Sequence, residues 1–266
     1  MTHLRTLPNG MAVHTLNRNE TDYLYKEIFE DEGYLPAEGL GLPDRPVIVD
    51  VGANIGMFSL FAAQRWPGAR VFSFEPVPRT FEALSRNIAA LPGVTAFNLA
   101  LGSAPEIRQL THYPQYTMMS GFDADPAEDK ALVRSYIENV AAGLDDPLRR
   151  EVFVEEADEL LEGRFEDVEL VACQVDRLDA VAARLGIDRI DFLKVDVEGF
   201  ELAVLQGIGD RLWPGIRNAA VEVEGGPAEL ARIDELFTRH GMRTAVDQPA
   251  EYRGTEVYTL FATRTA

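Results

Sequence analysis

The sequence predicts an α/β fold: a mostly parallel seven-stranded sheet with an antiparallel C-terminal strand, an N-terminal helix and a helical insertion. Short apolar runs that suit buried strands alternate with amphipathic segments of helical spacing. The alternation stops after Leu101 and resumes near residue 168. A short connection joins the last two apolar runs, which suits an antiparallel pair.

The first part of the chain supplies a helix and then regular strand and helix pairs. In residues 20–35, Tyr23, Leu24, Ile28 and Phe29 follow helical spacing after Thr21, a plausible N-cap. We expect this helix to belong to an N-terminal helical extension that reaches about residue 45. Strands are then expected at 46–51, 69–76 and 94–101, with helices at 57–66 and 79–90.

The next segment is strongly acidic. Residues 120–170 hold 16 acidic and 5 basic side chains, so they carry −11 of the formal net charge of −19. Apolar residues still recur at helical intervals near 127–142 and 147–161, which a disordered tail would lack. We therefore expect residues from about 106 to 170 to form a helical lid over the sheet.

The remaining sequence returns to the first pattern. Strands are expected at 168–175, 190–199, 217–226, 242–247 and 256–264, and helices at 178–185, 201–207 and 227–240. At 266 residues the chain can bury one sizeable core, so we expect residues 1–266 to form a single domain.

Composition narrows the class of protein. With 25 basic and 44 acidic residues, the chain is not expected to bind nucleic acid or an anionic membrane, because both require a basic face. The single cysteine, Cys173, fits a buried core position and a reducing compartment. The sequence shows neither a leader-like apolar segment nor a bilayer-spanning run, so we expect a cytoplasmic protein. The oligomeric state stays open.

Two strand ends indicate a ligand site. In "VIVDVGANIGMF", a strand with Asp50 is followed by a turn from Gly52 to Gly56 and then at once by a helix, a geometry that brings backbone N–H groups close to a ligand. Taken by itself, the pair of glycines is explained equally well by a tight turn that binds no ligand. Glu75 ends the next strand nineteen positions after Gly56, where a carboxylate can accept hydrogen bonds from a ribose diol. The turn lacks the patterns of dinucleotide and triphosphate sites.

These motifs resemble a known family. "DVGANIGMFSL", "FEPVPRTFEAL", "NLALGS" and "IDFLKVDVEGFELAVLQGI" are together similar to FkbM-family S-adenosylmethionine-dependent methyltransferases, from about Glu20 onward. The insertion and "VEVEGG" further resemble O-methyltransferases associated with polyketide and nonribosomal peptide assembly lines. The resemblance implies a class I methyltransferase Rossmann-like fold and a small-molecule acceptor, either free or bound to a carrier protein.

The resemblance also implies roles for individual residues. The methionine moiety of the cofactor would be surrounded by Asp50, Gly52, Asn54 and Gly56, its ribose bound by Glu75, and its adenine lined by Leu99, Ala100 and Leu101. Since the cofactor carries a sulfonium and an amino group, a rim that includes Asp50, Glu75 and Asp196 would attract it.

Further carboxylates are the candidate catalytic groups. Asp196 ends a buried strand, where an unpartnered carboxylate is costly, so a functional role is favoured; Glu198 fits an acid at a helix N-terminus equally well. Glu222 and Glu224 lie two apart and so on one face of a core strand, a placement that packing does not explain. The assembly-line relatives often have histidine at the position of Glu224, and this sequence departs from them there.

Three chemical routes remain open. Glu222 or Glu224 can act as a base whose pKa is raised by burial; Asp196, Glu222 and Glu224 can hold Mg²⁺; or His112, at the start of the insertion, can reach the site, the least favoured route. We expect O-methylation of a hydroxyl on a secondary-metabolite intermediate, whether polyketide, peptide or glycoside. The alternatives are a non-catalytic module that retains the cofactor fold, an N- or C-methyltransferase, and a nicotinamide-dependent dehydrogenase.

Overall fold

A central sheet organises the structure, a computed structural model that describes residues 2–37, 39–161 and 163–264. Its strand order is β11-β12-β10-β9-β3-β4-β5, and β12 runs antiparallel to both of its neighbours. The strands are β3 (Val47–Val51), β4 (Arg70–Phe74), β5 (Val94–Phe97), β9 (Phe192–Val195), β10 (Asn218–Val223), β11 (Arg243–Asp247) and β12 (Tyr258–Thr263). The predicted seven-stranded, mostly parallel sheet with an antiparallel last strand is confirmed.

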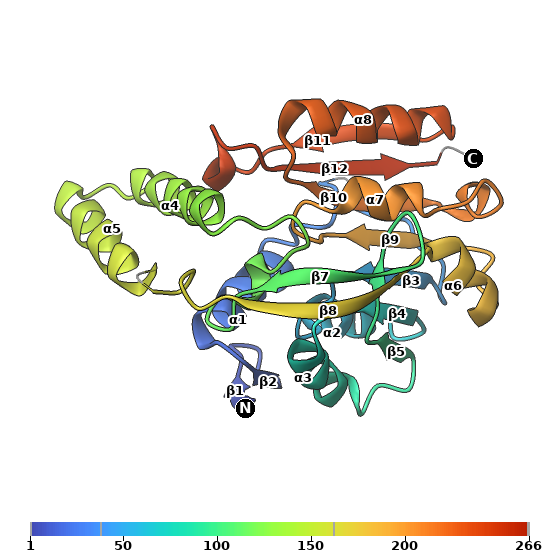
Figure 1. Ribbon diagram of the computed structural model, residues 1–266, viewed down its shortest axis with the longest axis horizontal. Coiled ribbons are helices and arrows are strands. Elements are labelled where there is room, and N and C mark those ends of the chain that lie inside the picture. Colours follow the sequence, from blue (N-terminus) through green and yellow to red (C-terminus); the bar gives the residue numbers. More distant parts are fainter. Residues whose placement is uncertain (1, 38, 162, 265–266) are drawn as a thin grey trace.

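Helices cover both faces of this sheet, because its central strands are apolar on both sides (Figure 1). On one face Val49, Leu193 and Val221 share a core with helices α6, α7 and α8. On the other face Ile48 and Phe192 share a core with α1, α2 and α3. The helices are α1 (Arg18–Tyr25), α2 (Met57–Arg65), α3 (Pro78–Ile88), α6 (Leu178–Leu185), α7 (Glu201–Gln206) and α8 (Gly226–Arg239). Among the described residues, no helix is both long and apolar enough to cross a bilayer.

A second sheet, in the order β6-β8-β7, corrects three expectations about the middle of the chain. Residues 94–101 were expected as one strand, but they divide into β5 and β6 (Ala100–Leu101). The chain leaves the main sheet at Asn98, whose side-chain amide donates to the carbonyls of Glu75 and Pro76 at 2.9 and 2.8 Å. Strand β8 (Glu169–Asp176) was expected in the main sheet, but it pairs with β6 and β7 instead.

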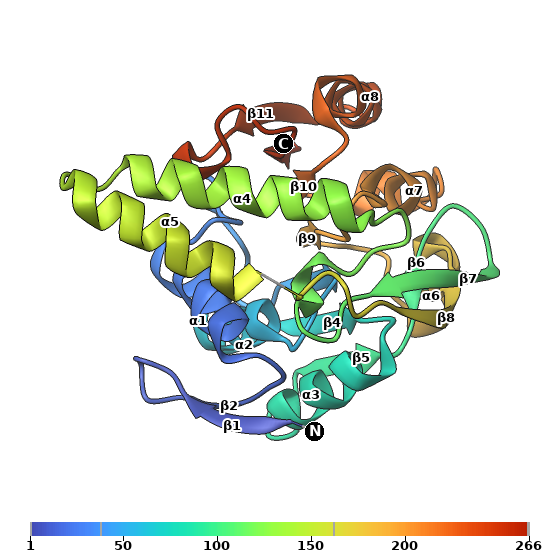
Figure 2. The ribbon, with the colours of Figure 1, turned by 60° about the vertical axis from the view of Figure 1, so that its left-hand side comes forward.

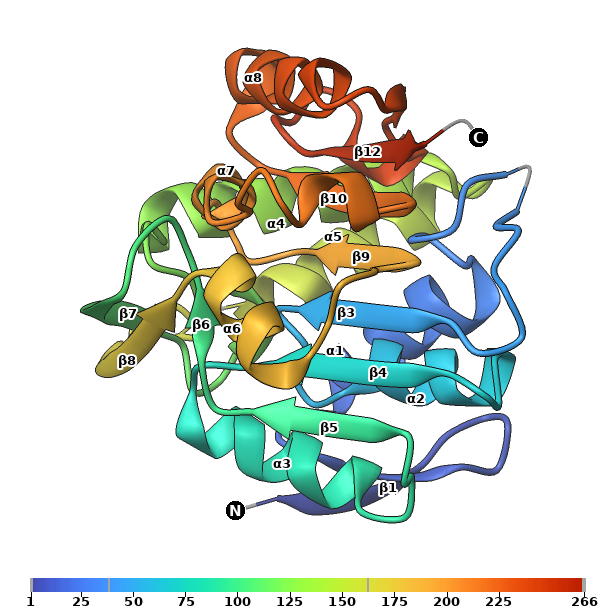
Figure 3. The same ribbon diagram turned by 90° about the vertical axis from the view of Figure 1, so that its right-hand side faces the viewer.

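Strand β7 (Glu106–His112) is the third correction, because the insertion was expected to be helical from about residue 106. Its burial alternates at the end, with Leu110 and His112 facing inward, but its polar composition hides that period. Figure 3 shows the small sheet on the side to which the arrowheads of β3, β4, β5 and β9 point. The small sheet therefore lies at the carboxyl ends of the parallel strands, where α/β folds bind ligands. Its Cys173 is buried, as predicted.

Two helices of the insertion form an antiparallel pair that protrudes from the sheet (Figures 1 and 2). Helix α4 (Pro126–Ala142) begins at a capping Asp125, whose side chain accepts from the backbone N–H groups of Ala127 and Glu128. Helix α5 (Pro147–Leu161) follows it. The Asn139 side chain of α4 donates to the carbonyls of Glu251 and Arg253, both at 2.9 Å, and so fastens the insertion to the C-terminal region.

The N-terminal extension differs from the helical segment that was expected. It opens with a hairpin of β1 (His3–Thr6) and β2 (Ala12–Thr15), which the sequence analysis did not predict. Helix α1 then begins at Arg18 with Asn17 as its N-cap, four residues before the cap predicted at Thr21. Thr21 is instead buried within the helix and donates its hydroxyl to the Asn17 carbonyl at 2.8 Å. Short helical turns complete the structure: Lys26–Glu30, Thr117–Met119, Trp213–Gly215 and Ala250–Tyr252.

Candidate active site

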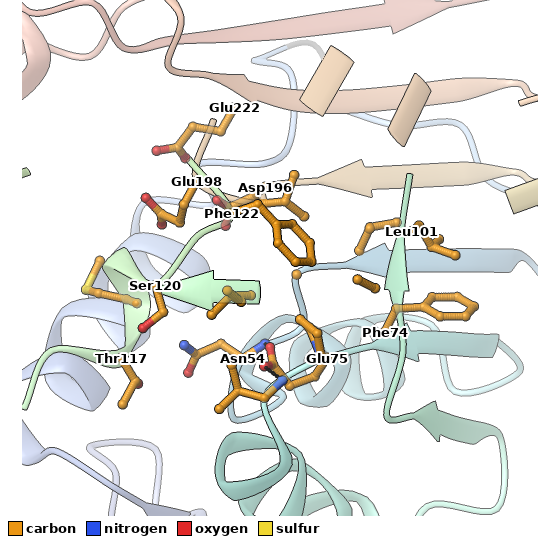
Figure 4. Close-up of a pocket in the computed structure, with 18 of the residues that line it drawn as sticks. Asn54, Phe74, Glu75, Leu101, Thr117, Ser120, Phe122, Asp196, Glu198 and Glu222 are labelled. Carbon is orange, nitrogen blue, oxygen red and sulfur yellow. Dashed lines mark hydrogen bonds between the residues drawn. The ribbon is translucent and has the colours of Figure 1, made fainter. Parts of the chain in front are cut away.

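A cavity with about 830 Å³ of empty space, partly open to solvent, lies at the carboxyl ends of the parallel strands. We call it the central cavity. Figure 4 shows Asp196, Glu198 and Glu222 on one side of it and Asn54 with Glu75 on another. Of the residues predicted to bind the cofactor, it is lined by Gly52, Asn54, Glu75, Leu99, Ala100 and Leu101.

The turn after β3 depends on the conformations of Gly52 and Asn54 and on hydrogen bonds to Glu75. Gly52 has a φ of 76°, and a Cβ there would stand 1.7 Å from the Asp196 carbonyl oxygen, so a larger residue would displace β9. Asn54 also has a positive φ, of 47°, which asparagine tolerates. The Glu75 carboxylate accepts from the backbone N–H groups of Asn54 and Val77 at 3.1 and 2.9 Å. Glu75 thereby fixes the turn, and burial raises its pKa to about 7.

Two of the predicted cofactor residues do not line the central cavity. Asp50 is completely buried beneath the turn, where it accepts a hydrogen bond from the Ser59 hydroxyl at 2.7 Å. Burial raises its pKa, although the charge of Lys194 opposes that rise. Gly56 is the N-cap of α2, and its α-carbon packs against Leu84 of α3. The structure thus places both residues behind the cavity wall.

Lys194 joins the ends of β3 and β9 at the centre of the site. Its ammonium group donates to the Gly52 carbonyl at 2.8 Å and lies 3.0 Å from the Asp196 carboxylate and 3.7 Å from Asp50. Burial lowers the pKa of Lys194, but the charges of Asp196 and Asp50 outweigh burial and leave the pKa above its usual value. Lys194 is therefore a cation that holds two carboxylates and the glycine turn together.

Asp196 faces the central cavity with its geometry already fixed. The same oxygen, Oδ2, accepts from Lys194 and from the Tyr34 hydroxyl, the latter at 2.8 Å. Tyr34 comes from the N-terminal extension and is buried, and burial followed by the charge of Asp196 raises its pKa. The extension thus supplies part of the wall of the site.

The carboxylates Glu198, Glu222 and Glu224 form a second group, which the fold brings together from β9 and β10. Glu198 has a φ of 55° and hydrogen-bonds with Glu224. Its turn is fixed by the buried Glu201, which accepts from the backbone N–H groups of Val197 and Gly199 at 3.3 and 3.0 Å. Glu224 does not line the central cavity; its pKa is raised to about 7 by burial.

Glu222 lies where three cavities meet. A larger space of about 1680 Å³, the outer chamber, lies between residues 23–37 and 245–261, and a smaller one of about 440 Å³, the insertion cavity, lies beneath α4. Tyr23, Glu222 and Tyr252 line all three spaces. Burial, followed by the charges of Asp196 and Glu27, raises the pKa of Glu222 well above its usual value. The Glu222 carboxyl therefore holds a proton more readily than an exposed glutamate does.

Hydrogen-bonded tyrosines surround this junction. The Tyr23 hydroxyl donates to Glu27 at 3.1 Å and lies 2.9 Å from the Tyr252 hydroxyl. The Tyr136 ring of α4 has its centroid 5.7 Å from that of Tyr23 and 5.2 Å from that of Tyr252. The N-terminal extension, the insertion and the C-terminal region therefore meet through aromatic contacts at one point.

The arrangement of the described residues supports neither the Mg²⁺ route nor the His112 route. Within residues 2–37, 39–161 and 163–264, no group of three or more histidine, cysteine, aspartate or glutamate side chains is placed to hold a metal ion, and this includes Asp196, Glu222 and Glu224. His112 is buried in β7, where its Nδ1 lies 3.1 Å from the Ser120 hydroxyl, and it does not line the central cavity. Burial lowers its pKa.

Several residues of the site escaped the sequence analysis. Lys194 gave a usable signal, since a lysine inside a buried apolar strand requires a partner. Glu27 and Tyr252 gave none, because they lie in segments far apart in sequence that only the fold brings together.

Comparison with known proteins assigns the family. The family model named Methyltransferase FkbM domain matches residues 50–244. The chain belongs to the FkbM methyltransferase family. It is 38% identical over 261 residues to 31-O-demethyl-FK506 methyltransferase FkbM of Streptomyces tacrolimicus, covering 98% of this chain and 96% of that protein. It is 34% identical to Methyltransferase sdnD of Sordaria araneosa, covering 90% and 88% respectively.

Two further matches differ in extent. AMB antimetabolite synthetase AmbE of Pseudomonas aeruginosa is 37% identical over 266 residues, which are 97% of this chain but only 12% of that protein. The crystal structure of Methyltransferase FkbM from Methylobacillus flagellatus KT superposes with a TM-score of 0.53 at 15% identity, covering 89% of this chain and 47% of that one. This structural likeness supports the shared methyltransferase fold. The family assignment and these relatives identify the chain as a methyltransferase.

Proposed function

We propose that this methyltransferase uses S-adenosylmethionine to O-methylate a small secondary-metabolite intermediate. The observation that carries the proposal is the central cavity, where carboxylates at the ends of the three strands β4, β9 and β10 surround one space beside the glycine turn after β3. When bound, S-adenosylmethionine supplies an electrophilic methyl group on a positively charged sulfur. The residues present fit such a cation, because Glu75, Asp196 and Glu222 all line the cavity.

In the proposed site the chain's own residues bind and orient the cofactor, and one of them accepts a proton from the acceptor. Glu75 offers carboxylate oxygens to a ribose diol, while Leu99, Ala100 and Leu101 form the apolar wall for a planar base. Asp196, fixed by Lys194 and Tyr34, would attract the positively charged part of the cofactor. Pre-set geometry of this kind aligns two reactants and supplies much of the rate enhancement.

Glu222 is the proposed base. Glu222 would accept the hydroxyl proton of the acceptor as its oxygen takes up the methyl group that S-adenosylmethionine would supply, and S-adenosylhomocysteine would be the other product. Two observations favour Glu222 over Glu224: Glu222 lines the central cavity and the spaces that an acceptor can enter, whereas Glu224 lines only the insertion cavity. The proposed mechanism uses no metal ion.

The relatives support the choice of acceptor. One is named for a methyl transfer to 31-O-demethyl-FK506, and another for the synthesis of an antimetabolite. By analogy, we place this chain in secondary metabolism, with an oxygen as the methylated atom.

The test is a pair of measurements on the same protein. Calorimetry should show binding of S-adenosylhomocysteine, and methyl-labelled S-adenosylmethionine should label a compound in a metabolite extract of the native host, with a methyl ether found by NMR. A thermal shift with NAD and none with S-adenosylhomocysteine would instead support a dehydrogenase. Label on nitrogen or carbon would overturn the oxygen assignment, and binding without any transfer would support a non-catalytic module.

A further inference from the structure

The outer chamber is the largest of the three spaces around Glu222, and its walls come from outside the family segment. Its lining consists of residues between 23 and 37 and between 245 and 261, together with Tyr136 and Glu222. The family model spans residues 50–244, so all of the lining except these two residues lies beyond it. The central cavity instead takes most of its lining from within that segment. Walls built from segments outside the family domain suit the part of the site that determines acceptor specificity.

The outer chamber and the central cavity share the residues around the proposed base. Tyr23, Glu27, Tyr34, Glu222 and Tyr252 line both this chamber and the central cavity, so the two spaces share one wall. An acceptor in the outer chamber can therefore present a hydroxyl to Glu222 while the rest of the molecule stays outside the central cavity.

The charge of the outer chamber is one-sided. Its acidic lining residues are Glu27, Asp31, Glu32, Glu222, Asp247 and Glu251, and its basic lining residue is Lys26. Lys26 forms an ion pair with Asp31, so its charge is already opposed by a carboxylate of the same wall. Asp31, Glu32 and Asp247 are exposed to solvent, whereas Glu27 and Glu222 lie deeper.

Apolar groups complete the walls. Leu35, Pro36 and Ala37 line one side, and Val246 and Phe261 line the other. A ligand that suits these walls has an apolar body and a positively charged end. A phosphate or carboxylate on the same body would meet like charges and would be repelled.

We propose that the outer chamber binds the methyl acceptor, and that this acceptor is a free small molecule that carries a protonated amine on the part that stays among Asp31, Glu32, Asp247 and Glu251. The amine forms charge-assisted hydrogen bonds with these carboxylates, and the reacting hydroxyl reaches Glu222. This inference rests on the proposed function where it takes Glu222 as the base of the methyl transfer. The chemical class of the ligand is argued from the lining of the outer chamber alone.

The first experiment measures ligand class without turnover. With S-adenosylhomocysteine bound, n-octylamine, n-octanol and octanoate are titrated calorimetrically; they share one alkyl chain and differ in the charge of the end group. We expect octylamine to bind at least about tenfold more tightly than octanoate, with octanol between them. The double variant Asp247→Asn, Glu251→Gln should lower the affinity for octylamine to nearly the affinity for octanol. Octanoate binding as tightly as octylamine would overturn the proposal.

The second experiment places the site. Ala245 is an exposed residue of β11 that lines the outer chamber, and Ala245→Trp fills part of that space. We expect this variant to lose octylamine binding and label transfer into the host extract while keeping its affinity for S-adenosylhomocysteine. Ala172→Trp is the matched control, an exposed strand alanine on β8 outside the lining of the chamber.

The outcomes separate the two proposals. If Ala245→Trp retains octylamine binding or label transfer at the wild-type level, the acceptor binds elsewhere and the further inference is wrong. If wild-type protein binds neither S-adenosylhomocysteine nor transfers label, the proposed function fails first, and the octylamine comparison still reports the ligand class of the outer chamber.

Discussion

The central cavity and the outer chamber share a wall but are built in opposite ways. In the central cavity several polar groups are held by partners: Glu75 holds the turn, and Lys194 holds Asp196 and the Gly52 carbonyl. In the outer chamber three of the six acidic lining residues, Asp31, Glu32 and Asp247, are exposed, and Lys26 with Asp31 is the ion pair found among its described lining residues. The central cavity has fixed geometry and suits one ligand. The outer chamber is larger and acidic, and it suits a class of ligands.

The largest expected effect is on kcat and comes from substitution of Glu222, which lines both spaces. Glu222→Gln keeps the shape of the side chain but removes the proton acceptor, so we expect kcat to fall by about 10²–10⁴-fold. The affinity for S-adenosylhomocysteine should stay within about twofold, because an amide fills the same space. Label transfer and calorimetry on the same preparation measure the two quantities.

Glu224→Gln is the matched comparison for that experiment. Glu224 lies outside the central cavity, so its substitution should lower kcat much less than Glu222→Gln. Wild-type turnover in Glu222→Gln, or an equal loss in both variants, would remove Glu222 from its assigned role.

A second prediction concerns the fixed geometry of the central cavity. Lys194→Met leaves the buried Asp50 and Asp196 without their shared cation, so we expect the free energy of unfolding to fall by about 3–5 kcal/mol. Denaturant unfolding measures this change. Lys130→Met, at an exposed position on α4, should change stability by less than about 0.5 kcal/mol. A small loss in Lys194→Met would show that the carboxylates do not depend on this ion pair.

These two regions also mark how far sequence reasoning reaches. Strand ends bring chemical groups to one edge of a parallel sheet, so Glu75, Asp196 and Glu222 could be selected from local patterns alone. Asp50 follows the same rule, yet the structure places it behind the wall, because the strand's alternation turns its side chain toward Ser59. Local pattern identifies the edge of the sheet and not the final direction of each side chain.

The outer chamber shows the other limit. Its walls combine an N-terminal segment with a C-terminal hairpin, and no periodicity links Glu27 to Tyr252. The second sheet was missed for a similar reason: β7 is polar along much of its length, so its pairing with β8 is decided by contacts across about 60 residues of intervening chain. Long-range pairing of this kind depends on the assembled fold.

A third, smaller effect tests how firmly the N-terminal extension is coupled to the central cavity. Tyr34→Phe removes the hydroxyl that donates to Asp196, so we expect S-adenosylhomocysteine to bind about tenfold more weakly. Tyr25→Phe is the control: Tyr25 is buried in the same extension and stacks on Phe29, but its hydroxyl has no hydrogen-bond partner among the described residues. Equal affinities in wild type and Tyr34→Phe would mean that Lys194 alone fixes Asp196.

The last prediction is a pH dependence of stability that involves Glu75 of the central cavity and Glu27, which lines both spaces. Burial raises the pKa of Glu75 and of Glu27 from 4.5 to about 7. The folded protein therefore binds more protons than the unfolded chain between these values, and the free energy of unfolding falls as pH rises from about 4.5 to about 7. Glu75→Gln should flatten part of this slope in denaturant unfolding at several pH values. Glu32→Gln, an exposed acid of the outer chamber, should leave the slope unchanged. A stability that rises with pH over this interval, or an equal change of slope in both variants, would contradict the contrast between a satisfied, buried site and an open, charged one.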